Sequence, residues 1–229
     1  MQVAWEARGN GAAATVTEDG WLVFQERLRD AREALIAASD ADPDGYTAPT
    51  VMLSVCMGMG LDREEMEYTF RQAMAANPDN RQACATKLEY LHPKWLGSRD
   101  GNDYLTFAWA LALHPGDGRM GETVLANLIF NNPISGLRFE AARVAMTGYY
   151  MRPAVWGVVR AAADRALEAD PDDRIPLNQM ARIAFLSNRL DTAREYFVRL
   201  GEDFSPAVFA DRAEYDRIRR EAGVPGAPR

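Results

Sequence analysis

The sequence predicts an all-α protein whose helices are stacked as successive pairs. Long stretches carry apolar residues at alternating steps of three and four, the spacing that gathers them on one face of a helix. Proline-containing junctions recur along the chain at similar intervals, and no alternating apolar run is long enough to require a β-sheet. Together these features predict an α-solenoid, an array in which each helix pair packs on the next.

The apolar pattern and the positions of Gly, Pro and capping residues divide the chain into roughly 11 to 12 helices. The expected helices span 2–8, 19–39, 48–59, 62–76, 80–91, 99–113, 119–131, 135–150, 153–169, 174–187, 190–200 and 206–222. Thr17 and Asp62 each precede a helix and are residue types that cap a helix N-terminus. We expect one domain over 1–222, with an irregular insertion at about 116–152, and a disordered tail at 223–229.

A repeat underlies this division. The junction Asp42-Pro43 recurs four times, and the successive prolines stand 35, 37, 56 and 35 residues apart. Five residues before each of the first four prolines stands an alanine, and eight residues before each stands a core-type residue. The later junctions are Asn77-Pro78, His114-Pro115, Asp170-Pro171 and Ser205-Pro206, the alanines are Ala38, Ala73, Ala110 and Ala166, and the core-type residues are Leu35, Phe70, Phe107 and Ala163. We interpret the alanine as the position where the second helix of a pair closely approaches its neighbours.

The unit at residues 174–206 carries the most complete version of the pattern. Its helices carry apolar and small residues at helical spacing: Leu177, Met180 and Ala181 on the first, and Ala193, Phe197 and Leu200 on the second. With these residues and with intervals close to the 34-residue period, the chain resembles the tetratricopeptide superfamily over most of its length. The first helix of this unit lacks the usual Trp and Gly, so the resemblance implies degenerate helix pairs, with a Sel1-like array as an alternative.

The resemblance also implies where a partner would bind, because the first helix of each unit in such arrays lines the concave groove. On the best-matching unit the groove positions are Asn178 and Arg182, and in the helix at 119–131 they are Arg119 and Glu122. Asn with Arg could clamp a peptide backbone or a carboxylate. The superfamily's carboxylate clamp also needs lysines, of which this chain has only two, so that specific function is not carried over.

The segment Leu91-His-Pro-Lys-Trp-Leu-Gly-Ser98 interrupts the helical pattern with Pro and Gly. It resembles a Pro-(Lys/Arg)-Trp-Gly-Gly-Ser signature of an uncharacterised bacterial helical-repeat domain, which implies relatives of unknown function. We expect Trp95 to fold back on the helix pair, the glycine to allow a turn, and Ser98 or Asp100 to cap the next helix. The alternative is a loop that presents Lys94 and Ser98 to a ligand, and Lys94, Trp95 and Ser98 are therefore candidate partner-binding residues.

The sequence carries no recognisable catalytic, metal or cofactor motif. The two histidines, His92 and His114, each precede a proline and belong to no His-Glu-x-x-His pattern. Cys-x-x-Cys, phosphate-binding Gly-rich loops and the Gly-x-Ser-x-Gly elbow are also missing. Cys56 and Cys84 stand in apolar helical stretches and are expected to be buried, reduced thiols. We therefore expect no enzyme activity, no catalytic residue, no metal site and no cofactor.

Composition narrows the class of partner. The formal net charge is −7, and the basic side chains alternate with acidic ones, so nucleic-acid binding is not expected. No run approaches the roughly 20 apolar residues that span a bilayer, and the N-terminus does not have the pattern of a signal peptide. We expect a cytoplasmic protein without membrane association, present as a monomer or a homodimer.

The favoured function is a non-catalytic scaffold that binds a partner protein or peptide on its concave groove. One alternative is an immunity- or inhibitor-type protein that binds a basic enzyme, because the charge of −7 would attract such a partner. Another is a helical small-ligand binder or enzyme that uses the region 139–156, where Phe139, Tyr149, Tyr150 and Trp156 gather. For these aromatic residues, a buried core between helices is the simpler interpretation.

Overall fold

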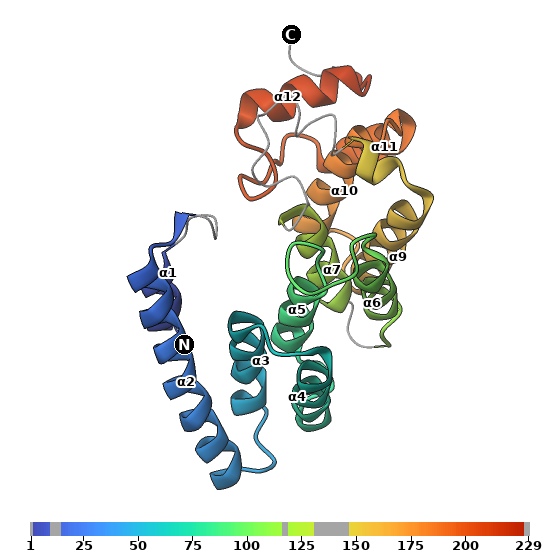
Figure 1. Cartoon of the computed structure of the whole chain (residues 1–229). Helices are drawn as coiled ribbons and strands as arrows, with labels where there is room; N and C mark the ends of the chain where they lie inside the picture. The colour runs from blue at the N-terminus through green and yellow to red at the C-terminus, as the bar shows by residue number, and fades with distance from the viewer. Residues whose placement is uncertain (1, 10–14, 116–118, 131–146, 227–229) are drawn as a thin grey trace. The chain divides into compact units, whose positions relative to one another are not determined.

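A computed structural model describes residues 2–9, 15–115, 119–130 and 147–226. The regular structure of these residues is helical, without a strand, so the all-α prediction is confirmed (Figure 1). The helices are α1 (Gln2–Arg8), α2 (Glu18–Ala41), α3 (Thr47–Met59), α4 (Arg63–Ala76), α5 (Arg81–Tyr90), α6 (Asn102–Ala112), α7 (Arg119–Phe130), α9 (Pro153–Ala169), α10 (Arg174–Leu186), α11 (Leu190–Leu200) and α12 (Arg212–Glu221). Residues 147–151 are also helical. None of the described helices has the length and apolar character needed to cross a membrane.

Where they are described, the helix boundaries lie within three residues of the predicted ones at all but one end. The helix predicted at 206–222 begins only at Arg212, so the prediction was wrong over its first six residues. Val208 and Phe209 are buried in the turn that precedes α12, which explains the apolar spacing there. Asp211 then caps α12 through a 2.7 Å hydrogen bond from the backbone N–H of Glu214. The helix predicted at 135–150 lies outside the described residues as far as 146.

The chain divides into two compact units, Met1–Gly97 and Ser98–Arg229. The first contains α1 to α5 and the second contains α6 to α12. The single domain expected over 1–222 stays a prediction. Of the tail expected to be disordered, residues 223–226 are described and include a buried Val224, whereas 227–229 lie outside the described residues.

In the first unit, α3 packs against both α2 and α4 (Figure 1). Aromatic rings join α1 to α2, with the ring centroids of Trp5 and Phe24 5.0 Å apart in an edge-to-face arrangement. Gly58 of α3 passes close to this cluster, because a Cβ at that position would lie 2.8 Å from Leu28 Cδ1. A larger residue at this position would force the Leu28 side chain to shift where α3 crosses α2.

The N-terminal caps predicted for α2 and α4 are confirmed. Thr17 Oγ1 accepts a 3.1 Å hydrogen bond from the backbone N–H of Gly20, and Asp62 Oδ1 accepts one of 3.0 Å from the backbone N–H of Glu65. Each bond satisfies a helix N–H that has no partner within its own helix.

In the second unit, α9 packs against α6, α7 and α10, and α10 pairs with α11 (Figure 1). Helices α7 and α9 cross closely at Gly121, where a Cβ would lie 2.3 Å from the carbonyl oxygen of Ala162. Ala181 and Ala193 are fully buried, as expected for the small residues where α10 and α11 meet.

The packing role predicted for the repeated alanines holds at two of the four positions. Ala73 and Ala166 are buried, but Ala38 and Ala110 are exposed, so the interpretation is wrong for these two. Alanine has the highest helix propensity, which is reason enough for it at an exposed helical position. No packing contact explains why the same spacing recurs there.

Candidate functional site

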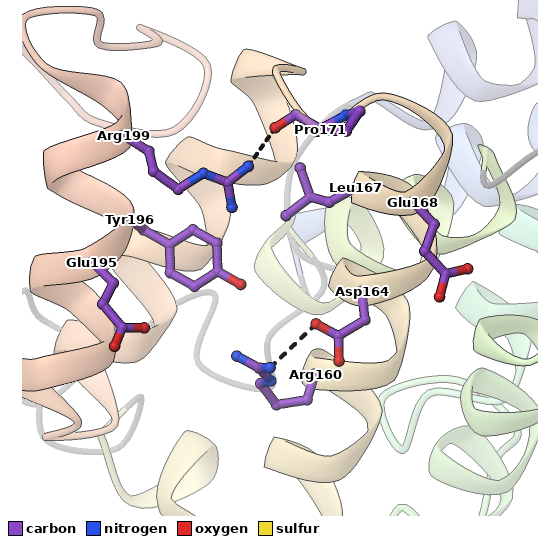
Figure 2. Close-up of a pocket in the computed structure, with 8 residues that line it drawn as sticks. All are labelled: Arg160, Asp164, Leu167, Glu168, Pro171, Glu195, Tyr196 and Arg199. Atoms are coloured by element: carbon purple, nitrogen blue, oxygen red, sulfur yellow. Dashed lines mark hydrogen bonds and ion pairs between the residues drawn. The ribbon is translucent and has the colours of Figure 1, made fainter.

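A groove of about 490 Å³ lies between α9 and α11 in the second unit (Figure 2). Helix α10 packs against both of these helices and fixes their separation. The lining residues are Arg160, Asp164, Leu167 and Glu168 of α9, Pro171 of the turn that follows it, and Glu195, Tyr196 and Arg199 of α11. The groove therefore combines five charged side chains with apolar walls.

The sequence of α9 places its charged residues on one side of the helix. Arg160, Asp164 and Glu168 stand four residues apart, so their side chains lie in a row. Ala162 and Ala166 are buried and carry the packing face instead. The same helix can therefore pack against its neighbours with one face and line the groove with the other.

Tyr196 is the central side chain of the groove. Its ring projects from α11 toward Asp164 and Leu167 of α9 (Figure 2). Only 6% of the residue is exposed, and within the described residues its hydroxyl makes no hydrogen bond. Burial raises the pKa of Tyr196 above the usual 10.0, so the phenol stays protonated and can both donate and accept a hydrogen bond.

The charged residues of the groove differ in how they are paired. Arg160 forms an ion pair with Asp164, with 3.2 Å between Nη2 and Oδ1, and Arg199 donates a hydrogen bond to the carbonyl oxygen of Pro171. Glu168 pairs outside the groove with Arg165 at 3.2 Å. Within the described part of the chain, the carboxylate of Glu195 has neither an ion pair nor a hydrogen bond.

A related groove lies between α2 and α4 in the first unit. Two separate hollows lie along these helices, one of about 580 Å³ whose lining includes Arg32 and one of about 680 Å³ whose lining includes Asp40 and Pro43. Arg32 stands eleven residues before Pro43, as Arg160 stands eleven residues before Pro171. Here the arginine bridges the groove through a 3.5 Å ion pair between Arg32 Nη2 and Glu65 Oε1 of α4.

The α9–α11 groove is equipped for recognition. A neutral phenol, an unpaired carboxylate and two guanidinium groups supply hydrogen bonds and ion pairs to a ligand. No cysteine, serine or histidine lines the groove, and no group of three or more metal-binding side chains is found in the described residues.

The structure places Asn178 and Arg182 of α10 against the chain itself. Asn178 is 1% exposed, and its amide donates to the carbonyl oxygen of Arg174 at 2.7 Å and accepts from the backbone N–H of Ser205 at 3.0 Å. Arg182 donates to the carbonyl oxygen of Val208 and forms a 3.1 Å ion pair with Glu214. These two side chains bind the backbone of residues 205–208, which follow α11 and are called the C-terminal segment below. Their binding of a partner stays a prediction.

The other predicted groove residues, Arg119 and Glu122, lie in the first turn of α7. Arg119 is exposed and Glu122 is half-buried, and both have interactions within the chain. Neither lines the groove between α9 and α11, so the structure does not bring them together with Tyr196.

The loop after α5 has the folded-back tryptophan that the sequence predicted. Trp95 Nε1 donates to Glu89 Oε1 at 2.8 Å, and its ring lies edge-to-face on Trp5 with 6.2 Å between centroids. Lys94 Nζ forms an ion pair with the same Glu89 oxygen at 2.8 Å. A Cβ at Gly97 would lie 1.7 Å from the carbonyl oxygen of Leu91, so this turn requires glycine. The contacts of Lys94 and Trp95 thus hold the loop in place.

The N-cap of α6 is Gly101, in a left-handed backbone conformation and without a side-chain cap bond, so the prediction that Ser98 or Asp100 occupies this position was wrong. Ser98 nevertheless bonds to the first turn of α6. Its hydroxyl accepts a 3.1 Å hydrogen bond from the backbone N–H of Asp103, and the Asp103 carboxylate accepts one of 3.2 Å from the backbone N–H of Ser98. Asp100 accepts a further bond of 3.0 Å from the backbone N–H of Asn102. Ser98 and Asp100 thus bond to separate N–H groups in the first turn of α6 from positions before its N-cap.

Of the aromatic residues at 149–156, Tyr150 is buried as expected for a core residue, whereas Tyr149 and Trp156 are half-buried. Tyr150 is buried and its hydroxyl donates to the carbonyl oxygen of Leu128 at 2.9 Å, while burial raises the pKa of Tyr149 to about 12. The ring of Trp156 carries the guanidinium of Arg189, 4.2 Å from its centroid. Phe139, the fourth residue of the predicted cluster, lies outside the described residues.

The sequence interpretation missed the α9–α11 groove because it assigned binding to the first helix of each pair, whereas this groove lies between second helices. One signal was available. Arg160, Asp164 and Glu168 repeat at four-residue spacing on a helix whose other face is alanine-rich, a pattern that leaves a charged face without an assigned partner.

Comparisons of the chain with models of protein families, with curated proteins and with solved structures find no match. The resemblance to tetratricopeptide arrays and that of the Pro-Lys-Trp-Leu-Gly-Ser segment accordingly stay predictions made from sequence.

Proposed function

We propose that the chain is a non-catalytic, cytoplasmic scaffold of degenerate tetratricopeptide-like helix pairs, and that it binds a segment of a partner protein or a peptide in the α9–α11 groove. The observation that carries the proposal is Tyr196, a residue that is 6% exposed and whose hydroxyl points into the groove without a hydrogen bond in the described residues. A hydroxyl that opens into a groove and makes no hydrogen bond within the protein is available to bond to a ligand.

The repeat relationship between the two units supports the scaffold architecture. In each unit a middle helix packs between two others, α3 between α2 and α4 and α10 between α9 and α11. In each case the outer helices line a groove with an arginine eleven residues before the junction proline. The same spacing thus yields the same surface feature twice, as expected of repeats.

We place binding in the α9–α11 groove because Asn178 and Arg182 already bond to the chain itself. Their polar groups already bond to the C-terminal segment, so a ligand at that face would first have to displace the segment. The α9–α11 groove is open, and its unused acceptors are Glu195 and Tyr196.

A display experiment tests the proposal. Random peptides on phage are selected on the immobilised full chain, and the affinities of the selected peptides are then compared among three proteins. The groove variant is Glu195→Gln/Tyr196→Phe, which removes one charge and one hydroxyl. The matched control is Glu26→Gln/Tyr46→Phe, which makes the same changes at exposed residues of the first unit.

We expect peptides that bind wild type and control equally and the groove variant at least about threefold more weakly, the effect of one partly exposed polar interaction. Peptides indifferent to the groove substitutions would move the site elsewhere, and the failure to select any peptide would count against a peptide-binding scaffold.

An inhibitor of a basic enzyme is a second candidate function. It is favoured by the net charge of −7 together with the unpaired carboxylate of Glu195 in an open groove. Such a partner would present a folded surface, so its binding would survive in the full-length enzyme but not in peptides cut from it.

A further inference from the structure

We infer that the α9–α11 groove is a receptor for a single basic side chain, an arginine or a lysine carried by the partner segment. This inference rests on the proposed function and specifies the chemistry of the partner. Its basis is a groove lined by a carboxylate, of Glu195, and by the hydroxyl of a nearly buried tyrosine, Tyr196, neither of which has a hydrogen bond in the described residues.

Two hydrogen-bond acceptors that line the groove have no donor in the described residues. Tyr196 is more than nine-tenths buried, and its hydroxyl is directed toward α9 without a hydrogen bond in the described residues (Figure 2). Glu195 precedes it on α11 and also lines the groove without a partner there. A guanidinium or ammonium group donates hydrogen bonds to phenol oxygens and to carboxylates, so it is a ligand that suits both of these acceptors.

The charge balance points in the same direction. The groove is lined by three carboxylates, of Asp164, Glu168 and Glu195, and by two guanidinium groups, of Arg160 and Arg199. Each guanidinium already has a protein acceptor, the Asp164 carboxylate for Arg160 and the Pro171 carbonyl oxygen for Arg199. An anion would need to compete for these donors, whereas a cation can pair with Glu195, the lining carboxylate that has no ion pair in the described residues.

The walls suit the aliphatic part of a basic side chain. Leu167 is 9% exposed and faces Tyr196 across the groove, so the two supply apolar surface on opposite sides (Figure 2). Arginine and lysine bury their methylene stems along apolar surface while the charged end stays in a polar environment. The net charge of −7 adds a long-range attraction for basic segments.

The test is a titration of the ¹⁵N-labelled full chain, followed by NMR, with three acetylated and amidated tripeptides. The probes are Ala-Arg-Ala, its citrulline analogue and Ala-Glu-Ala. Citrulline has the shape of arginine without the charge, so the difference in affinity between the first two probes measures the effect of the positive charge. Tighter binding of the third probe would indicate an anion site. The protein variants are Glu195→Gln and Tyr196→Phe, with Glu26→Gln and Tyr46→Phe as matched controls.

We expect the arginine probe to shift amide signals of α9 and α11 saturably and to bind at least about threefold more tightly than the citrulline probe. Each groove substitution should weaken the arginine probe by a similar factor, and the controls should not. Equal affinity for arginine and citrulline, preference for the glutamate probe, or insensitivity to both groove substitutions would overturn the inference.

The display experiment separates this inference from the proposed function. Selected peptides that depend on the groove residues but lack Arg and Lys would agree with the proposed scaffold function. They would overturn the inference that the groove binds a basic side chain. Saturable binding of the arginine probe in the groove, without any selected peptide, would support the receptor chemistry and contradict a peptide-binding scaffold.

Discussion

The amide oxygen of Asn178 lies 3.0 Å from the backbone nitrogen of Ser205 and accepts its hydrogen bond. The same side chain donates to the carbonyl oxygen of Arg174, one turn earlier in α10. A residue whose position predicted contact with a partner thus fixes the chain's own C-terminal segment to its last helix pair. The consequence is a set of stability predictions that differ from those for a surface binding residue.

Asn178→Ala should lower the free energy of unfolding by about 2 kcal/mol. The substitution removes two hydrogen bonds and leaves the buried backbone N–H of Ser205 without its acceptor, which costs its desolvation free energy. Urea denaturation measures the change, and Asn102→Ala is the control because Asn102 is exposed. An Asn178→Ala variant as stable as wild type would contradict the role of Asn178 in holding the segment.

Gly121→Ala should destabilise the second unit by about 1–3 kcal/mol, the typical cost of overpacking. The new Cβ would lie 2.3 Å from the carbonyl oxygen of Ala162, and neither backbone can yield without separating α7 from α9. Thermal unfolding followed by circular dichroism measures the effect. Gly148→Ala is the matched control because a Cβ there meets nothing within 4 Å, so its melting temperature should stay the same or rise.

Gly97→Ala should open the loop that carries Trp95. The added Cβ would lie 1.7 Å from the carbonyl oxygen of Leu91, so the turn must move and the 3.2 Å hydrogen bond from the Leu96 N–H to the Tyr90 carbonyl oxygen is lost. Hydrogen exchange at the Leu96 amide should therefore become faster. Leu96→Ala, at a side chain that is 47% exposed, should leave the rate of exchange in this loop nearly unchanged. Equal exchange in Gly97→Ala and wild type would show that the loop adapts without loss of this bond.

Cys84 should make the protein less stable at alkaline pH. Cys56 and Cys84 are buried and free, as the sequence predicted, and burial raises the pKa of the Cys84 thiol from 9.0 to about 12. Between these values the folded state keeps a proton that the unfolded chain releases, so stability falls as pH rises through this window. At pH 10 the loss is on the order of 1 kcal/mol.

Cys84→Ala removes this titration. Urea denaturation at pH 7 and pH 10 should therefore show that the stability advantage of wild type over Cys84→Ala shrinks by about 1 kcal/mol. Glu26→Gln, at an exposed carboxylate, should differ from wild type by the same amount at both pH values. A wild-type advantage that is independent of pH would show that the Cys84 thiol titrates alike in both states.

Features that depend on contacts between near neighbours in the chain could be predicted from the sequence, whereas features that depend on distant segments could not. The caps at Thr17 and Asp62 bond to N–H groups three residues away, so sequence was sufficient to place them. The turn before α12 was mistaken for helix because the burial of Phe209 depends on α11 and α12, and apolar spacing does not distinguish a buried turn from a helix. The groove of Tyr196 depends on two helices separated in the chain by a third, and no local pattern reports that separation.

The sequence by itself determined the helical class, nearly all the described helix boundaries and the N-terminal caps of α2 and α4, because these depend on apolar periodicity and on contacts between near neighbours. Only the tertiary structure decided which polar side chains remain available to a ligand. Asn178 and Glu195 are both polar residues of the last helix pair, yet the first is buried against Ser205 and the second lines an open groove. The physical reason is that a side chain's free hydrogen-bonding capacity is set by whichever distant segment packs against it, here the C-terminal segment that covers one face of α10 and leaves the α9–α11 groove open.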